Sequence, residues 1–284
     1  MSIFSSVRLK YRTCAAACAV ALLLLAPARA QIPKVPATPG AAAALAAAEW
    51  SEFTCRGPTE FSQLNYPLRH STRRLANGEP LTIVAIGSSS TSGAGASSPA
   101  MSYPSRLAVE LKQRFPGREI TVLNRGVSGQ ETQEMMARFA TDVIPAHPDL
   151  VLWQVGTNSV LRDHPLRPHS VLLREGIAEL KEAGADVVLI DMQFVPRVIA
   201  KPETAGMEDQ IAVAAKEQSV DLFRRFALMR YWHDVQHIPF ETFVSPDGLH
   251  MNDWSYACVA KLLGAAIAEA ATRPVASAAA RFGR

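Results

Sequence analysis

The feature that most constrains this chain is a repeated alternation between short apolar runs and longer amphipathic segments. The runs are rich in β-branched residues, as strands buried on both faces are, and lie at residues 81–86, 120–123, 150–155 and 187–190, with a weaker candidate at 219–222. Helical spacing of apolar residues follows at 102–115, 131–144, 169–183, 208–218 and 253–271. This order predicts a three-layer α/β/α fold with a parallel sheet of about five strands.

The first thirty residues have the pattern of a secretory signal peptide. Three basic residues precede an apolar run over residues 15–26, and Ala28-Arg29-Ala30 supplies the small residues that signal peptidase requires. An uncleaved membrane anchor is the alternative, but the run is shorter than the ~20 residues that span a bilayer. We therefore expect residues 1–30 to be removed, leaving a periplasmic or secreted protein without stable membrane insertion.

The remaining chain is expected to hold one domain. Residues 31–78 are predicted to be an N-terminal leader and linker, because their first part is rich in proline and alanine. The predicted strands and helices occupy residues 79–272, and residues 273–284 form a C-terminal tail. Four basic and no acidic residues leave with the signal peptide, so the formal charge changes from +3 to −1. This balance gives no support for a nucleic-acid partner.

Two cysteines, Cys55 and Cys258, would remain after cleavage in an oxidising compartment. They either form a disulfide or stay as two buried thiols, and the sequence leaves both alternatives open. A bond across this separation would stabilise the fold by up to ~5 kcal/mol. The chain has no Cys-x-x-Cys pair, and we expect no metal site.

Serine and glycine dominate the loop after the first predicted strand, at residues 87–95. A serine at a strand-to-loop turn can expose its hydroxyl and direct its own N–H toward a developing oxyanion. Ordinary turns are also rich in these residues. Phosphate binding is disfavoured, because the loop has neither a Gly-Lys-Ser/Thr ending nor a Gly-x-Gly-x-x-Gly spacing.

Three further segments carry polar residues where a parallel sheet collects its functional loops. Asp247 and His250 precede the last helix, and their spacing lets the carboxylate hold Nδ1 while Nε2 accepts a proton. Gly129 follows the second strand and Asn158 the third. A backbone N–H and an amide side chain are uncharged donors suited to an oxyanion. Singly, each segment is equally compatible with a helix-capping turn.

In this order, the four segments resemble the sequence blocks of SGNH/GDSL hydrolases. The resemblance implies a flavodoxin-like SGNH hydrolase fold that needs no cofactor. It makes Ser89 the nucleophile, His250 the general base and Asp247 the residue that orients the base. It also implies an oxyanion hole formed by the N–H groups of Ser89 and Gly129 and by the side-chain amide of Asn158.

The resemblance covers about residues 81–265, with two departures from the family pattern. The first block usually reads Gly-Asp-Ser, and here Ser88 takes the middle position. The third often reads Asn-Asp, and here Ser159 follows the asparagine. Neither aspartate belongs to the family's triad, so the chemistry is retained. Hydrogen bonding around the nucleophile and substrate preference are left open.

The sequence thus predicts an exported serine esterase that acts on small-molecule or glycan esters, short-chain or O-acetyl, through an acyl-serine intermediate. An acyltransferase acting on envelope glycans would use the same triad, and a catalytically inert glycan-binding relative is a third alternative. Two weaker expectations concern other residues. Further histidines, His169 among them, are expected to face solvent. Residues 192–194, directly after the fourth strand, are placed to line an acyl pocket.

Overall fold

The computed structural model describes residues 55–273. The predicted signal peptide, the first part of the leader and residues 274–284 lie outside the described residues. Five strands form one parallel sheet in the order β2-β1-β3-β4-β5: β1 (Leu81–Gly87), β2 (Ile120–Gly126), β3 (Leu150–Gln154), β4 (Asp186–Ile190) and β5 (Asp221–Phe223). The predicted fold class is therefore confirmed.

Burial differs between the middle and the edge of the sheet. All five residues of β3 are buried, which explains their continuous apolar sequence, since helices cover both faces. In β2, an edge strand, only Ile120 is buried. Because parallel strands end at the same edge, the loops that follow them are brought together there.

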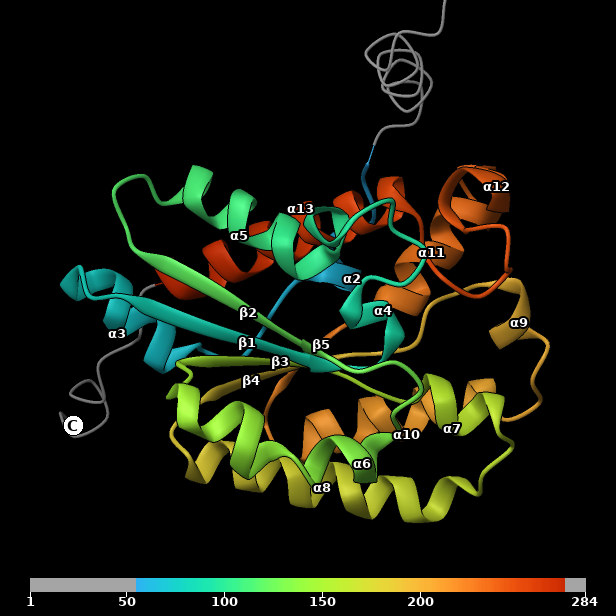
Figure 1. Cartoon of the computed structure of the whole chain (residues 1–284), viewed down its shortest axis with the longest axis horizontal. Helices are drawn as coiled ribbons and strands as arrows, with labels where there is room; N and C mark the ends of the chain where they lie inside the picture. The colour runs from blue at the N-terminus through green and yellow to red at the C-terminus, as the bar shows by residue number, and fades with distance from the viewer. Residues whose placement is uncertain (1–54, 274–284) are drawn as a thin grey trace, which may run out of the picture. The chain divides into compact units, whose positions relative to one another are not determined.

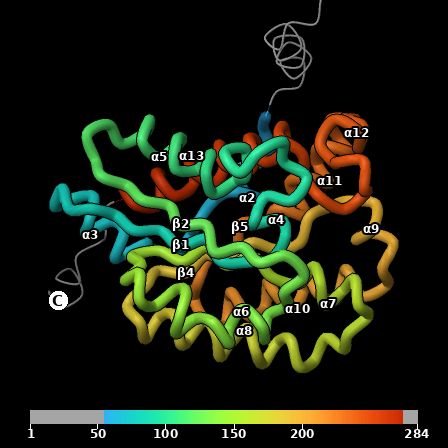
Figure 2. The backbone as a smooth tube through the Cα atoms, viewed as in Figure 1, coloured from blue at the N-terminus to red at the C-terminus, as the bar shows by residue number. Residues whose placement is uncertain are grey.

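Helices cover the two faces of the sheet, as Figures 1 and 2 show. One face carries α2 (Thr59–Ser62), α3 (Arg69–Asn77), α5 (Tyr103–Arg114), α11 (Arg225–Asp234) and α13 (Asp253–Thr272). The other carries α6 (Thr132–Met136), α8 (Leu166–Glu182) and α10 (Thr204–Glu217). Short helices α4 (Ser89–Ser92), α7 (Thr157–Leu161), α9 (Pro196–Ile199) and α12 (Phe240–Phe243) occupy connections near the end to which the strand arrows point.

Two predicted helices, 131–144 and 169–183, differ from the structure in detail, and α11 was not predicted. The segment 131–144 divides into α6, a π-helical turn η2 (Phe139–Val143) and a 3-10 turn η3 (Ile144–Ala146), because Arg138 leaves helical geometry and donates to the Arg125 carbonyl. Helix α8 begins three residues early, since proline is tolerated in a first turn. The sequence missed α11, whose buried face includes the charged Arg225.

The domain begins before residue 79, so the predicted linker is wrong for its second part. Leu64, Leu68 and Leu75 are at most 6% exposed and belong to the hydrophobic core. Helix α3 is also anchored to the sheet, because Ser71 donates through N–H and Oγ to the Asp186 carboxylate at 2.9 Å each. Residues 55–78 therefore pack as part of the domain.

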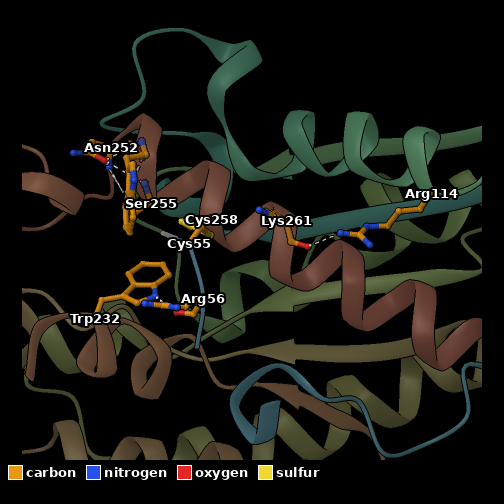
Figure 3. The surroundings of a disulfide bond; sticks show 9 residues. Cys55, Arg56, Arg114, Trp232, Asn252, Ser255, Cys258 and Lys261 are labelled. Atoms are coloured by element: carbon orange, nitrogen blue, oxygen red, sulfur yellow. Dashed lines mark hydrogen bonds between the residues drawn. A yellow bond between two sulfur atoms is a disulfide. The ribbon is translucent and has the colours of Figure 1, made fainter. Parts of the chain in front are cut away.

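Cys55 and Cys258 form a disulfide, with their Cα atoms 5.4 Å apart, so the disulfide alternative is confirmed. Figure 3 shows the bond joining the start of the described chain to α13. Beside it, Trp232 Nε1 donates to the Arg56 carbonyl at 3.0 Å. Within residues 55–273, no helix has the length and apolarity needed to cross a membrane.

Candidate active site

The turn that carries the predicted nucleophile, called the nucleophile turn, spans residues 87–92 and comprises the end of β1 and helix α4. Ser89 is the first residue of α4 and is half-buried, whereas Ser88 and Ser90 are 2% and 1% exposed. A Cβ at Gly87 would lie 2.1 Å from Thr91 Oγ1, so the turn requires glycine there. The tight turn therefore buries the two neighbouring serines and leaves Ser89 as the one that reaches the site.

The side chain of Gln154, at the end of β3, holds this turn in place by hydrogen bonds. It is 1% exposed, and its Oε1 accepts hydrogen bonds from the N–H and Oγ of Ser88, both at 2.9 Å. Thr91 Oγ1 lies 3.4 Å from the same oxygen. Ser88, which stands where the family usually has aspartate, thus donates to a neutral amide and is fully paired.

The turn that carries the predicted base, called the base turn, spans residues 245–250, and its hydrogen bonds converge on one carboxylate. Asp247 Oδ1 accepts from the N–H groups of Leu249 and His250, each at 2.9 Å, and from Ser245 Oγ at 2.8 Å. Asp247 Oδ2 lies 2.5 Å from His250 Nδ1. Directly after the turn, Asn252 caps α13 by accepting from the N–H groups of its first turn.

The two turns meet at a hydrogen bond of 2.9 Å between His250 Nε2 and Ser89 Oγ. Burial alone would raise the pKa of Asp247, but the backbone N–H groups of His250 and Leu249 and the imidazole hold that pKa well below its usual range. An ionised carboxylate only accepts hydrogen bonds, so Nδ1 carries the imidazole proton. Nε2 is therefore the acceptor for the Ser89 hydroxyl.

The predicted oxyanion donors Gly129 and Asn158 lie on the neighbouring loops. Gly129 has φ of +82°, a left-handed conformation that favours glycine. Within the described residues, the N–H groups of Ser89 and Gly129 donate to no protein group. Asn158, at the start of α7, donates one amide N–H to the Gln130 carbonyl at 2.8 Å and keeps its second free within the described chain. That bond ties the second and third blocks together.

Glu131 secures this pair of loops, a feature that sequence reasoning missed. Its carboxylate accepts from Ser159 Oγ at 2.8 Å, forms an ion pair with Arg162 and lies 2.9 Å from His164 Nδ1. Burial alone would raise the pKa of Glu131, but these hydrogen bonds lower it. Arg162 also donates to the Gly129 carbonyl at 2.8 Å.

Among the histidines expected to face solvent, His169 is the exception. His169 is 4% exposed, and its Nδ1 lies 3.0 Å from Thr132 Oγ1. Burial lowers its pKa to about 4, so this imidazole is neutral. Met192, Gln193 and Phe194, which are expected from the sequence to line an acyl pocket, are 0%, 1% and 9% exposed and so lie below the surface. Position in the sequence does not reveal what packs over these side chains.

Hollows border the site on two sides. One of about 380 Å³ is lined by residues that include Glu131 and Ser159, next to the oxyanion loops. Another of about 410 Å³ is lined by residues that include Ser245 and Gly248, within the base turn. Across residues 55–273, no group of three or more histidine, cysteine or acidic side chains is arranged to hold a metal ion.

Known proteins resemble this chain in sequence or in fold. An arylesterase from Vibrio mimicus is 30% identical over 150 residues, which are 52% of this chain and 70% of the arylesterase. A two-domain esterase active on acetylated mannans has 21% identity and a TM-score of 0.61 over 81% of this chain, which spans 58% of that protein. Axe2, an acetylxylan esterase from Geobacillus stearothermophilus, has 19% identity and a TM-score of 0.53, covering 68% of this chain and 95% of Axe2.

The structural likenesses, at such low identity, establish the fold alone. The family follows from a different comparison, because the model of the non-GDSL lipase-like family matches residues 54–273, well over half of the sequence. The chain therefore belongs to the non-GDSL lipase-like family, a group of SGNH/GDSL-type carboxylic ester hydrolases.

Proposed function

We propose that this protein is an exported serine esterase that hydrolyses short-chain acyl esters, with O-acetyl groups on glycans as its substrate class. The observation that carries the proposal is the continuous hydrogen-bond chain from Asp247 through His250 to Ser89. Such a chain sets the imidazole tautomer that a general base needs. Family membership and the arylesterase relative support ester hydrolysis.

In the first half of the reaction, Ser89 Oγ attacks the ester carbonyl carbon while its proton passes to His250 Nε2. The carbonyl oxygen becomes an oxyanion and accepts from the N–H groups of Ser89 and Gly129 and from the Asn158 amide. Asp247 stabilises the imidazolium that has formed. The tetrahedral intermediate then collapses, and the proton on Nε2 goes to the departing alcohol oxygen.

In the second half, water attacks the acyl-serine carbonyl and gives a proton to His250 Nε2. The same donors hold the second oxyanion. Collapse breaks the bond between the acyl carbon and Ser89 Oγ, and the proton returns to the serine. The products are a carboxylic acid and the regenerated hydroxyl, so the cycle needs no cofactor.

Two observations support the narrower parts of the proposal. The mannan-active esterase and Axe2 act on acetylated glycans, and this chain shares their fold. The Cys55–Cys258 disulfide fits an oxidising compartment, in agreement with the signal-peptide pattern of residues 1–30.

A chain-length series tests the proposal. Wild-type protein and Ser89→Ala would be compared on p-nitrophenyl acetate, butyrate and octanoate and on acetylated xylan and mannan. We expect the highest wild-type kcat/KM on acetate, release of acetate from a glycan, and nearly complete loss in Ser89→Ala. Equal turnover by Ser89→Ala would refute the triad. A preference for octanoate without release from glycans would refute the substrate class, and an acylated sugar product would indicate transfer.

A further inference from the structure

A fully buried arginine lies beneath the candidate active site. Arg225 begins α11 and is 0% exposed. Its Nη1 donates to Ser90 Oγ at 3.1 Å, and its Nη2 donates to the Asp191 carbonyl at 2.6 Å and to Gln193 Oε1 at 3.0 Å. Burial lowers its pKa, while the nearby Asp191 raises it. A buried cation is costly unless its neighbours are polar, so this position calls for an explanation.

Gln193 extends the network in two more directions. This side chain follows β4 and is 1% exposed. Its Oε1, which accepts from Arg225, also accepts from Thr157 Oγ1 at 3.1 Å. Its Nε2 donates to the Leu249 carbonyl at 3.2 Å. One amide therefore connects the loops after β3 and β4 with the base turn.

Ser90, Thr157 and Leu249, the three residues of the site loops to which Arg225 and Gln193 bond, are called the anchors and share one property. Each lies one position from a proposed catalytic residue: Ser90 follows Ser89, Thr157 precedes Asn158, and Leu249 precedes His250. We infer that Gln193 and Arg225 are positioning residues that hold the nucleophile, the oxyanion donor and the general base in register, an inference that rests on the proposed function. Neither touches the reacting atoms.

The geometry explains why one network serves three loops. Ser90 follows β1, Thr157 follows β3 and Leu249 precedes α13, so these segments are far apart in the sequence. In Figure 1, α4 and α7 lie at the same end of the sheet. Displacing a catalytic group by about 1 Å can cost about 10²-fold in rate. A buried pair of side chains joined to its neighbours by several hydrogen bonds limits such displacement better than solvated side chains would.

The chemistry of the two side chains suits the task. An amide can accept from two donors and donate to a carbonyl at once, whereas a carboxylate cannot donate. A guanidinium presents several N–H groups in a rigid plane, which lysine does not. Arg225→Lys should therefore restore only part of the activity that Arg225→Met loses.

The main test is Gln193→Met, which keeps the side-chain volume and removes every hydrogen bond of the amide. Active sites would be counted by titration with a fluorophosphonate, so that kcat refers to folded, reactive enzyme. We expect kcat on p-nitrophenyl acetate to fall about 10²-fold with KM changed less than about threefold. A purely structural role would lower the number of titrated sites and leave kcat per site unchanged, which would overturn the inference.

Asp149→Asn is the matched control. Asp149 directly precedes β3, at the end of the strands opposite to the candidate site. Asp149 is also buried and accepts from the Thr82 N–H at 3.0 Å and from Arg74 Nε at 2.8 Å. This variant should lower the melting temperature without changing kcat per site. If its kcat fell as far as that of Gln193→Met, the effect would be general destabilisation and the inference would fail.

Thr157→Val keeps the inference testable should Gln193→Met not fold. The change is nearly isosteric and removes the hydrogen bond of a single anchor, the one to Gln193 Oε1. We expect a several-fold fall in kcat per site, and wild-type kcat would overturn the inference. Ser89→Ala distinguishes failure of the positioning inference from failure of the proposed function. If Ser89→Ala is inactive while the Gln193 and Thr157 variants are fully active, only the positioning inference fails; an active Ser89→Ala refutes the proposed function itself.

Discussion

The nucleophile turn and the base turn meet at one hydrogen bond but are held in place mainly by different means. The base turn is largely on the surface, with the Asp247 side chain 44% exposed, and the hydrogen bonds of its carboxylate connect residues at most three positions apart. The nucleophile turn has buried flanks held by Gln154 and Arg225, which lie 66 and 135 positions from their serine partners. Local bonds therefore orient the imidazole of His250, while long-range bonds position Ser89 and, through Leu249, support the base turn.

The largest effect should come from Asp247→Asn. Asparagine Oδ1 can still accept from the turn's N–H groups, but its amide cannot accept the Nδ1 proton, so the wrong imidazole tautomer is favoured. We expect kcat to fall about 10⁴-fold with little change in melting temperature. Steady-state kinetics and thermal unfolding would measure both. A loss below tenfold would mean that the base turn does not orient His250.

Gln154→Met should give the opposite pattern in the nucleophile turn. It leaves the buried Ser88 N–H and hydroxyl without their acceptor, which costs about 1–3 kcal/mol of unfolding free energy for a group left unpaired. The displaced turn should also lower kcat about 10²-fold. Denaturant titration would measure the loss of unfolding free energy, and steady-state kinetics would measure the loss of kcat. Unchanged stability would show that the long-range brace is dispensable.

Removing the disulfide should affect stability and spare activity. The double variant Cys55→Ala/Cys258→Ala removes the link between residue 55 and α13, and we expect a loss of about 2–5 kcal/mol in unfolding free energy with kcat unchanged. Wild-type protein reduced with dithiothreitol provides the control and should show the same loss. A large fall in kcat would mean that the base turn, which lies just before α13, depends on this bond for its position.

The smallest effect concerns pH. Burial raises the pKa of Asp191 to about 7, while the Phe226 N–H and Arg225 act against it. The folded state then keeps a proton that the unfolded chain has lost, so this group makes stability fall as pH rises from about 4 to about 7. Asp191→Asn should flatten that part of the stability curve, measured as unfolding free energy against pH. An unchanged slope would exclude Asp191 as its source.

The contrast between the turns also explains what the sequence could predict. Buried strands such as β3 appear as apolar runs, and the Asp-x-x-His spacing of the base turn is visible because its partners are close in sequence. The broken helix after Glu131 and the missed α11 depend on tertiary contacts of Arg138 and Arg225. No local pattern encodes those contacts.

The same reasoning applies within the site. Ser89, Gly129 and Asn158 lie in loops whose position after each strand follows from the predicted sheet, so resemblance to a family could locate them. From its position after β4, Gln193 is expected at a pocket wall. Its burial is instead set by contacts with segments more than thirty positions away, which the sequence does not reveal. The bracing roles of Gln154 and Glu131 became evident only from the bonds they form.

We propose that His250 activates Ser89 as the nucleophile. Covalent labelling of Ser89 is the most direct measurement of this activation. A fluorophosphonate probe would be reacted with wild-type protein, Ser89→Ala and His250→Ala, and the modified residue identified by peptide mass spectrometry. We expect a single adduct on Ser89, no adduct in Ser89→Ala, and labelling slowed by several orders of magnitude in His250→Ala. An adduct on another serine that persists in Ser89→Ala, together with retained hydrolysis of p-nitrophenyl acetate, would contradict it.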